Sequence, residues 1–177
     1  MATDCAHPVK RSLSFSRKLG IVVGGLAAYA GFVALGNWRD HHAFVINASE
    51  SLPNWAFLVT LGQFPKRGEF VVFDPGKDPL TIKHFGARPS PFAKIVYGVP
   101  GDLVTRDGNQ VSVNGTPVVK TKPLTKQGEV LLPGPTGVVP RGCVFAGSPH
   151  KDGFDSRYQA IGFVCADRLL GVGVAVL

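Results

Sequence analysis

One uninterrupted apolar stretch near the N-terminus restricts this chain more than any other feature. The stretch runs from Leu19 to Gly36 and contains eighteen residues without a charge. As a helix it would be about 27 Å long, at a rise of about 1.5 Å per residue, which is just enough to cross a bilayer. We therefore expect one transmembrane anchor over residues 19–36.

A cleaved signal peptide has the same order of basic and then apolar residues, so it is the alternative to an anchor. The triplet Ala28-Tyr29-Ala30 fits the small-x-small pattern of a cleavage site. However, the apolar run continues past Ala30 to Gly36, and no small-residue site accompanies the polar residues that begin at Asn37. The pattern favours a retained anchor.

Positive charge before the apolar stretch predicts the orientation of the chain in the membrane. The first eighteen residues contain Lys10, Arg11, Arg17 and Lys18. Cytoplasmic flanks of membrane helices carry such an excess of Lys and Arg. We expect residues 1–18 to form a cytoplasmic basic tail and residues 37–177 to form a periplasmic catalytic domain, with the anchor in the inner membrane of a bacterium and in contact with its lipid.

The length of 177 residues leaves room for one compact domain after the anchor. The formal net charge is +7, but the positive residues beyond the tail are scattered through turns rather than gathered on a stripe with aromatic residues. Nucleic-acid binding is therefore not expected. A membrane surface explains the charge balance better.

The region after His42 has the pattern of short strands and tight turns. Asn114-Gly115 lies between two alternating apolar segments, which is the strongest short-range signal for a hairpin. We found no sustained helical period beyond the anchor, so the domain is predicted to be mainly β. Strands are expected over 69–73, 94–99, 103–106, 110–113 and 116–119, with more strand around Val138, Val139, Val144 and Phe145.

Cysteine and histidine residues leave one question open and make a metal site improbable. Cys143 and Cys165 both follow the anchor and would form a disulfide in an exported domain. Two buried free thiols are an equal alternative. The five histidines and three cysteines lack paired metal-ligand spacing. We expect neither a metal nor another cofactor.

Three separated segments carry the chemistry. They are NASESLP at 47–53, KIVYGVPGD at 94–102 and GSPHKDGFDSRYQAIGFV at 147–164. In order and content they resemble the signal peptidase family, in which a Ser/Lys pair cleaves exported precursors. The most specific match is the spacing of Lys94, Gly98, Pro100, Gly101 and Asp102. The resemblance implies a mainly β, signal-peptidase-like catalytic domain after one N-terminal transmembrane helix.

The serine segment is closest to one branch of that family. Pro53 follows Ser51 by two residues, as in the TraF-type peptidases of conjugative transfer, whereas general signal peptidases have Ser-Met-x-Pro. The resemblance implies an exported pilin precursor as substrate. In that branch the acyl-enzyme can be resolved by the amine of the pilin itself, which gives a cyclic product.

Ser51 and Lys94 are the expected catalytic residues. A serine hydroxyl is a weak nucleophile until a neighbouring base takes its proton. A lysine can act as that base only when it is neutral, which requires an apolar setting. Lys94 is flanked by Phe92, Ala93 and Ile95. The resemblance therefore implies Ser51 as nucleophile and Lys94 as general base, and His150 is not required.

Four further residues receive supporting roles from the resemblance. Ser49 corresponds to a serine that donates to the oxyanion, although an ordinary loop serine is the alternative. Asp155 and Arg157 are expected to form a structural ion pair, with a direct catalytic role of Asp155 as the alternative. Gly153 stands where general signal peptidases have a serine that orients the lysine. Some other group, or water, must therefore orient Lys94, and Ser156 and Asp155 are two candidates.

Two other functions compete with the pilin peptidase. One is a general signal peptidase, which would cleave many exported precursors. The other is an inactive scaffold protein of the transfer apparatus, against which the presence of both Ser51 and Lys94 argues. The aromatic residues Trp55, Phe57 and Phe64 near Ser51 would line the substrate cleft, dip into the bilayer or pack in the core.

Overall fold

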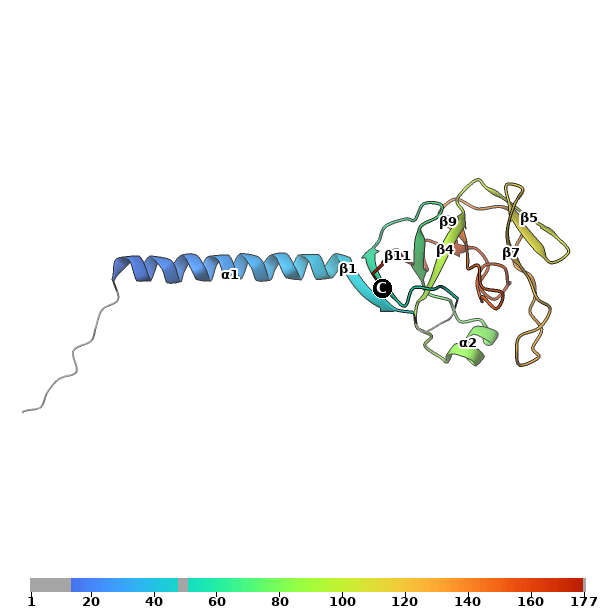
Figure 1. Ribbon diagram of the computed structural model, residues 1–177, viewed down its shortest axis with the longest axis horizontal. Helices are drawn as coiled ribbons and strands as arrows, with labels where there is room; N and C mark the ends of the chain where they lie inside the picture. Colours follow the sequence, from blue (N-terminus) through green and yellow to red (C-terminus); the bar gives the residue numbers. More distant parts are fainter. Residues whose placement is uncertain (1–13, 48–50, 177) are drawn as a thin grey trace, which may run out of the picture. The chain divides into compact units, whose positions relative to one another are not determined.

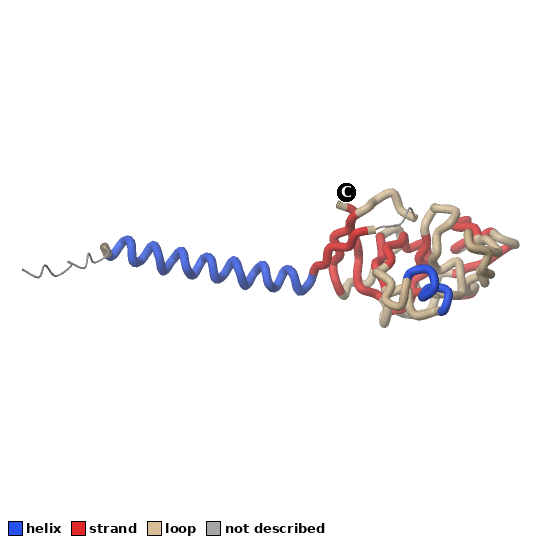
Figure 2. The backbone as a smooth tube through the Cα atoms, turned by 90° about the horizontal axis from the view of Figure 1, so that it is seen from below, coloured by secondary structure: helices blue, strands red, loops and turns tan. Residues whose placement is uncertain are grey.

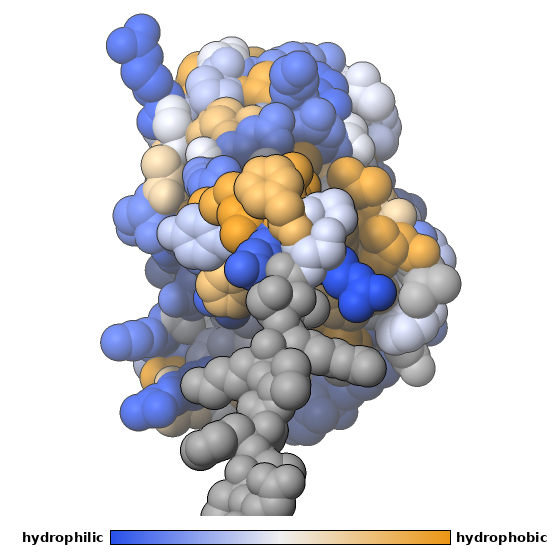
Figure 3. All heavy atoms as spheres, turned by 90° about the vertical axis from the view of Figure 1, so that its left-hand side faces the viewer, coloured by the Kyte–Doolittle hydropathy of each residue, from blue (hydrophilic) through white to orange (hydrophobic). Residues whose placement is uncertain are grey.

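The computed structural model describes residues 14–47 and 51–176, and it divides into an N-terminal unit and a unit that begins at His41. The N-terminal unit is the helix α1 (Phe15–His41). This helix is long and apolar enough to cross a membrane, a test that a signal sequence also passes. Its described apolar side chains are exposed, as Phe32 is at 76%. Figure 3 colours the described residues by hydropathy. The helix extends beyond the predicted 19–36 at both ends.

The second unit is built on a seven-stranded antiparallel sheet, counted over the described residues (Figure 1). The predicted strand at 94–99 corresponds to β4, which lies between β3 and β9. In sheet order the strands are β1 (His42–Ile46), β2 (Ala56–Leu61), β11 (Leu169–Ala175), β3 (Phe70–Phe73), β4 (Phe92–Gly98), β9 (Cys143–Gly147) and β10 (Val164–Cys165).

A second sheet of four described strands contains the predicted hairpin. Asn114 and Gly115 both have positive φ, at 49° and 79°, as a two-residue hairpin turn of type I′ requires. The strands before and after this turn pair in antiparallel register. In sheet order the strands are β7 (Thr116–Lys120), β6 (Gln110–Val113), β5 (Leu103–Asp107) and β8 (Gly137–Val138). The prediction of a mainly β domain is confirmed.

One short helix was missed by the sequence analysis. Helix α2 (Pro79–Phe85) begins after Asp78, whose side chain accepts a hydrogen bond from the backbone N–H of Leu80, and it ends at Gly86 with φ of 85°. The helix has only seven residues, which is too short for an apolar period to show. The prediction of a mainly β domain thus did not include this helix. The Asp-Pro pair, a capping residue followed by proline, is the signal that predicts this helix. Figure 2 shows α2 in blue among strands and loops.

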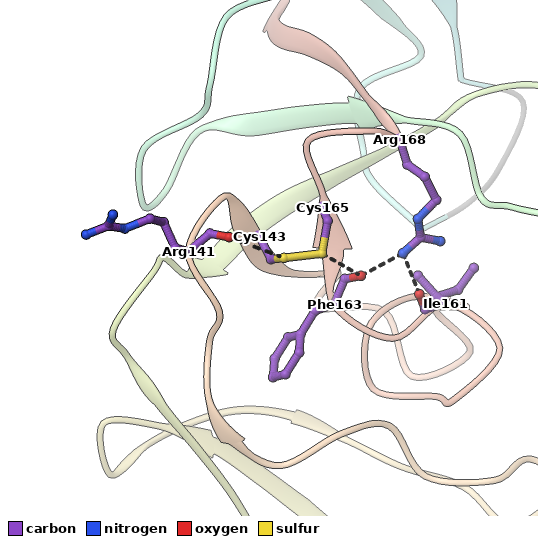
Figure 4. The surroundings of a disulfide bond; sticks show 6 residues. All are labelled: Arg141, Cys143, Ile161, Phe163, Cys165 and Arg168. Carbon is purple, nitrogen blue, oxygen red and sulfur yellow. Dashed lines mark hydrogen bonds between the residues drawn. A yellow bond between two sulfur atoms is a disulfide. The ribbon is translucent and has the colours of Figure 1, made fainter.

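Cys143 and Cys165 form a disulfide between β9 and β10 (Figure 4). The two residues are direct partners in the antiparallel register of these strands. Beside the disulfide, Arg168 donates hydrogen bonds of 2.7 Å to the carbonyl oxygens of Ile161 and Phe163. Of the two alternatives that the sequence left open, the structure contains the disulfide. The third cysteine, Cys5, lies outside the described residues.

Candidate active site

Ser51 and Lys94 meet in the interior of the domain. Ser51 lies in the turn before β2, and Lys94 lies in β4. The Nζ atom of Lys94 is 2.6 Å from Oγ of Ser51. Ser51 is only 8% exposed and Lys94 only 4%. A nucleophile and a base at hydrogen-bond distance are what acyl transfer requires.

Apolar neighbours surround the Lys94 amine. Its strand partner in β3 is Val71, and the ring of Phe92 lies 5.5 Å from Nζ. Burial disfavours the ammonium form. Burial thus lowers the pKa of Lys94 from 10.5 to about 8, while the charge of Asp155 raises this pKa and the charge of Arg157 lowers it further. At pH 7 about one lysine in ten is therefore neutral.

The loop after β9 contains a buried ion pair whose charges act on Lys94. Arg157 Nε lies 2.8 Å from Asp155 Oδ1, and Arg157 Nη2 lies 2.9 Å from Asp155 Oδ2. Neither residue is exposed by more than 2%. Arg157 also donates to the carbonyl oxygens of Ser148, His150 and Lys120. The ion pair that the sequence predicted is present. Through Arg157 it connects two other positions of the same loop, Ser148 and His150, with Lys120 at the end of β7.

The other predicted residues lie in different surroundings. Ser156 is buried, and its hydroxyl accepts a hydrogen bond of 3.0 Å from the backbone N–H of Ala146. The Ser156 hydroxyl therefore binds the backbone of β9. Ser49, the predicted oxyanion donor, lies outside the described residues. His150 lines the same cavity as Ser51 and Lys94, and its Nδ1 accepts from the backbone N–H of Asp152.

A cavity of about 420 Å³ opens onto the dyad. Besides Ser51 and Lys94, its lining includes Phe85 of α2, Phe154 and Lys126. Phe85 and Lys126 were missed because they lie outside the segments that resemble the family, and Phe85 belongs to the unpredicted helix. Phe154 lies inside the segment 147–164, but no pattern there indicates which apolar side chains face the cavity. A site of this size, mainly apolar with a few polar groups, can hold a short piece of polypeptide.

The aromatic residues near Ser51 in the sequence do not line this cavity. Phe57 is fully buried and belongs to a core cluster. Trp55 and Phe64 are 53% and 40% exposed. Of the three alternatives in the sequence analysis, core packing therefore holds for Phe57. Among the described residues, no group of three or more His, Cys, Asp or Glu side chains is placed to hold a metal ion.

Comparison with known proteins identifies the family. The family model described as "Signal peptidase, peptidase S26" matches residues 17–177. The chain belongs to the signal peptidase family, and it is a peptidase of the signal peptidase type. Members of this family are serine endopeptidases that act on exported precursors, and the family together with the one apolar helix indicates a membrane-anchored protein.

Solved structures include a similar protein. It is a signal peptidase I from Enterococcus faecalis V583, solved at 2.27 Å resolution, with 23% sequence identity and a TM-score of 0.37. The match covers 62% of this chain and 97% of that chain. No curated protein matches this chain.

Proposed function

We propose that this chain is a membrane-anchored serine endopeptidase in which Ser51 is the nucleophile and Lys94 is the general base. The observation that supports this proposal is the 2.6 Å contact between Nζ of Lys94 and Oγ of Ser51 inside the apolar interior. The lowered pKa of Lys94, about 8, provides a neutral amine near physiological pH. A lysine that is exposed to solvent does not have such a lowered pKa, because burial is what disfavours the ammonium.

The reaction follows from these two groups. The Oγ atom of Ser51 attacks the scissile carbonyl carbon, and the Ser51 proton passes to Nζ of Lys94. When the tetrahedral intermediate collapses, the C–N bond breaks and the Lys94 ammonium returns the proton to the leaving amine. A second nucleophile then attacks the ester of Ser51 and transfers a proton to Lys94. The C–O bond to Ser51 breaks, the Lys94 ammonium returns this proton to Oγ of Ser51, and the acyl group is released on the second nucleophile. Water gives a linear product, and an amine of the substrate gives a cyclic one.

Oxyanion stabilisation is assigned to the backbone N–H of Ser51 and the hydroxyl of Ser49. Ser49 is assigned by its position two residues before Ser51. An oxyanion donor contributes about 10²- to 10³-fold to the rate of acyl transfer. Ser49→Ala should therefore reduce processing by this factor and leave measurable activity, in contrast to Ser51→Ala.

The proposed substrate is an exported pilin precursor of a conjugative system. The support is the Ser-x-Pro arrangement of Ser51 and Pro53, which resembles the TraF-type branch. A general signal peptidase is the second candidate. Incubating the full chain with one pilin precursor and a panel of other exported precursors separates the two candidates, because only a general enzyme cleaves the panel.

The proposed location is the inner membrane of a bacterium, with the catalytic domain in the periplasm and the chain divided into residues 1–18, 19–36 and 37–177. Arg17 and Lys18 directly before the apolar run support this orientation. The family match begins at residue 17 and so includes the helix, which favours a retained anchor. A reporter that works only after export should be active when it is fused after Leu177. A reporter that is active in the cytoplasm would overturn this location.

The dyad itself is tested by substitution in the full chain. Ser51→Ala and Lys94→Ala should each abolish processing, and the double variant should be no worse than either, because the two residues act as one unit. Lys94→Arg should also fail, since a guanidinium does not deprotonate. Ser112→Ala and Lys77→Arg, which lie outside the site, are the matched controls. Processing by Ser51→Ala at the rate of the controls would refute the assignment of Ser51 as the nucleophile.

A further inference from the structure

Ser148 occupies a position that sequence comparison does not bring out. Strand β9 ends at Gly147, which pairs with Ile95 of β4. Ser148 is the next residue, one position beyond the last pair of the two strands. Extending the antiparallel register by this one position sets Ser148 opposite Lys94, and residues that are opposite in an antiparallel pair share one face of the sheet.

The contacts of Ser148 are all directed to the buried ion pair. Ser148 is completely buried. Its backbone N–H donates 3.0 Å to Oδ2 of Asp155, and its hydroxyl donates 3.2 Å to the same oxygen. Its carbonyl oxygen accepts from Nη2 of Arg157. Asp155 is thus held at Oδ1 by Arg157 and at Oδ2 by Ser148 and Arg157, so that its carboxylate has one fixed orientation.

Gly153 provides the space for this arrangement. A Cβ atom at position 153 would lie 2.1 Å from Oγ of Ser148 and 2.9 Å from Oδ2 of Asp155. Both distances are shorter than van der Waals contact allows. The Ser148 hydroxyl fills the volume that a side chain at position 153 would occupy. The Ser148 hydroxyl therefore fits only because residue 153 is a glycine.

We propose that Ser148 is a positioning residue for the catalytic dyad: its hydroxyl and backbone N–H fix the Asp155 carboxylate in the space beside Gly153, so that a negative charge faces the Lys94 amine. This inference rests on the proposed function of Ser51 and Lys94. It assigns the orienting role, which the sequence analysis left to Ser156 or Asp155, to Ser148 acting together with Asp155.

The physical effect concerns the ammonium that forms when Lys94 takes the Ser51 proton. This ammonium is buried, so a facing carboxylate stabilises it. Two charged groups of the loop act on Lys94, namely Asp155 and Arg157. The partner on the other side, Val71 of β3, is apolar. The cavity also contains the ionisable side chains of Lys126, His150 and Asp152.

Removal of the Ser148 hydroxyl weakens the attraction between Asp155 and Lys94. With one donor lost, the Asp155 carboxylate turns toward Arg157 and its charge is less available to the amine. Because Asp155 raises the pKa of Lys94, the pKa of Lys94 should fall in Ser148→Ala. The amine then becomes a weaker and less well oriented base. The loss should appear in kcat rather than in KM, since Ser148 is not among the residues that line the cavity.

The test is a titration of Lys94 in the full chain in detergent micelles, with ¹³C-labelled lysine observed by NMR. The Lys94 signal is the one that disappears in Lys94→Arg. Its midpoint should lie near the pKa of about 8 in the unchanged protein. In Ser148→Ala the midpoint should fall by about half a pH unit or more. Ser156→Ala is the matched control, because it also removes a buried hydroxyl of the same loop, and it should leave the midpoint unchanged.

Processing kinetics provide the second readout. Above about pH 9, where Lys94 is mostly neutral in both proteins, Ser148→Ala should lower kcat by up to about tenfold and change KM by less than about twofold. If Ser148→Ala does not fold, Ser148→Cys replaces it, because the thiol has the same connectivity as the hydroxyl and is a weaker donor. The proposal is wrong if the Lys94 midpoint of the folded Ser148 variant equals that of Ser156→Ala. Retained processing by Ser51→Ala would instead count against the dyad, and the NMR titration, which needs no substrate, keeps the two failures apart.

Discussion

Leu52 and Ala93 belong to one buried cluster, and each is the chain neighbour of a proposed catalytic residue. Leu52 follows Ser51, and Ala93 precedes Lys94. The cluster also contains Phe57, Val59 and Val72, so the packing of this core brings together two side chains that are 43 positions apart in the sequence. The 2.6 Å contact between Ser51 and Lys94 therefore depends on apolar packing as well as on the hydroxyl and the amine themselves.

The first prediction concerns this packing. Leu52→Ala should lower the free energy of unfolding by about 2 to 5 kcal/mol, because it leaves a cavity in the core. It should also reduce processing, since Ser51 loses the neighbour that anchors its turn. Leu124→Ala is the control, because Leu124 is 46% exposed. Denaturant unfolding and precursor processing are measured for both variants, and equal behaviour of the two would contradict the role of Leu52.

The second prediction is a dependence of activity on pH. Lys94 acts as a base only when it is neutral, and its pKa is about 8. In the free enzyme kcat/KM should therefore rise about tenfold per pH unit up to about pH 8 and then level off. Asp155→Asn removes the charge that raises this pKa, so the midpoint should move to lower pH. A rate that is constant between pH 6 and 9 would speak against Lys94 as the base.

The third prediction concerns stability. The pKa of Lys94 in the folded protein, about 8, lies below its ordinary value of 10.5, so below pH 8 the folded chain carries a buried ammonium at a cost of about 3 kcal/mol. Between these two pKa values the unfolded chain binds more protons, and stability rises with pH. Lys94→Met should thus stabilise the protein by up to about 3 kcal/mol at pH 7. Thermal unfolding should show this gain shrinking as the pH rises from about 8 to 10.5 and vanishing above that range. A lower stability of Lys94→Met at pH 7 would contradict the prediction.

The fourth prediction concerns the disulfide of Cys143 and Cys165, which are 22 positions apart. Closing a loop of this length stabilises a protein by about 3 kcal/mol. Reduction of the exported protein should therefore lower its free energy of unfolding by this amount, whereas the double variant Cys143→Ser, Cys165→Ser should not respond to reductant. Mass mapping without reductant that finds both thiols free in exported protein would exclude the bond.

The sequence was sufficient to predict those parts of the fold that depend on short-range chemistry. Asn114-Gly115 predicted a hairpin because few residue pairs tolerate positive φ at both positions. The approach of Ser51 to Lys94 followed from family resemblance. Helix α2 was missed, because a helix of seven residues is too short to show a repeating pattern of apolar residues. Ser148 was missed as well, because its position opposite Lys94 depends on the pairing of β4 with β9, which no local pattern shows.

The most direct test of the account is to trap the acyl-enzyme. The full chain is mixed with precursor, quenched with acid and digested, and the masses of its peptides are compared with those of the untreated protein. The peptide that contains Ser51 should gain the mass of the acyl group, and this adduct should be absent from Ser51→Ala and from Lys94→Arg. An adduct on a different residue, or mature product released by Ser51→Ala at the rate of the unchanged protein, would contradict the assignment of Ser51 as the nucleophile.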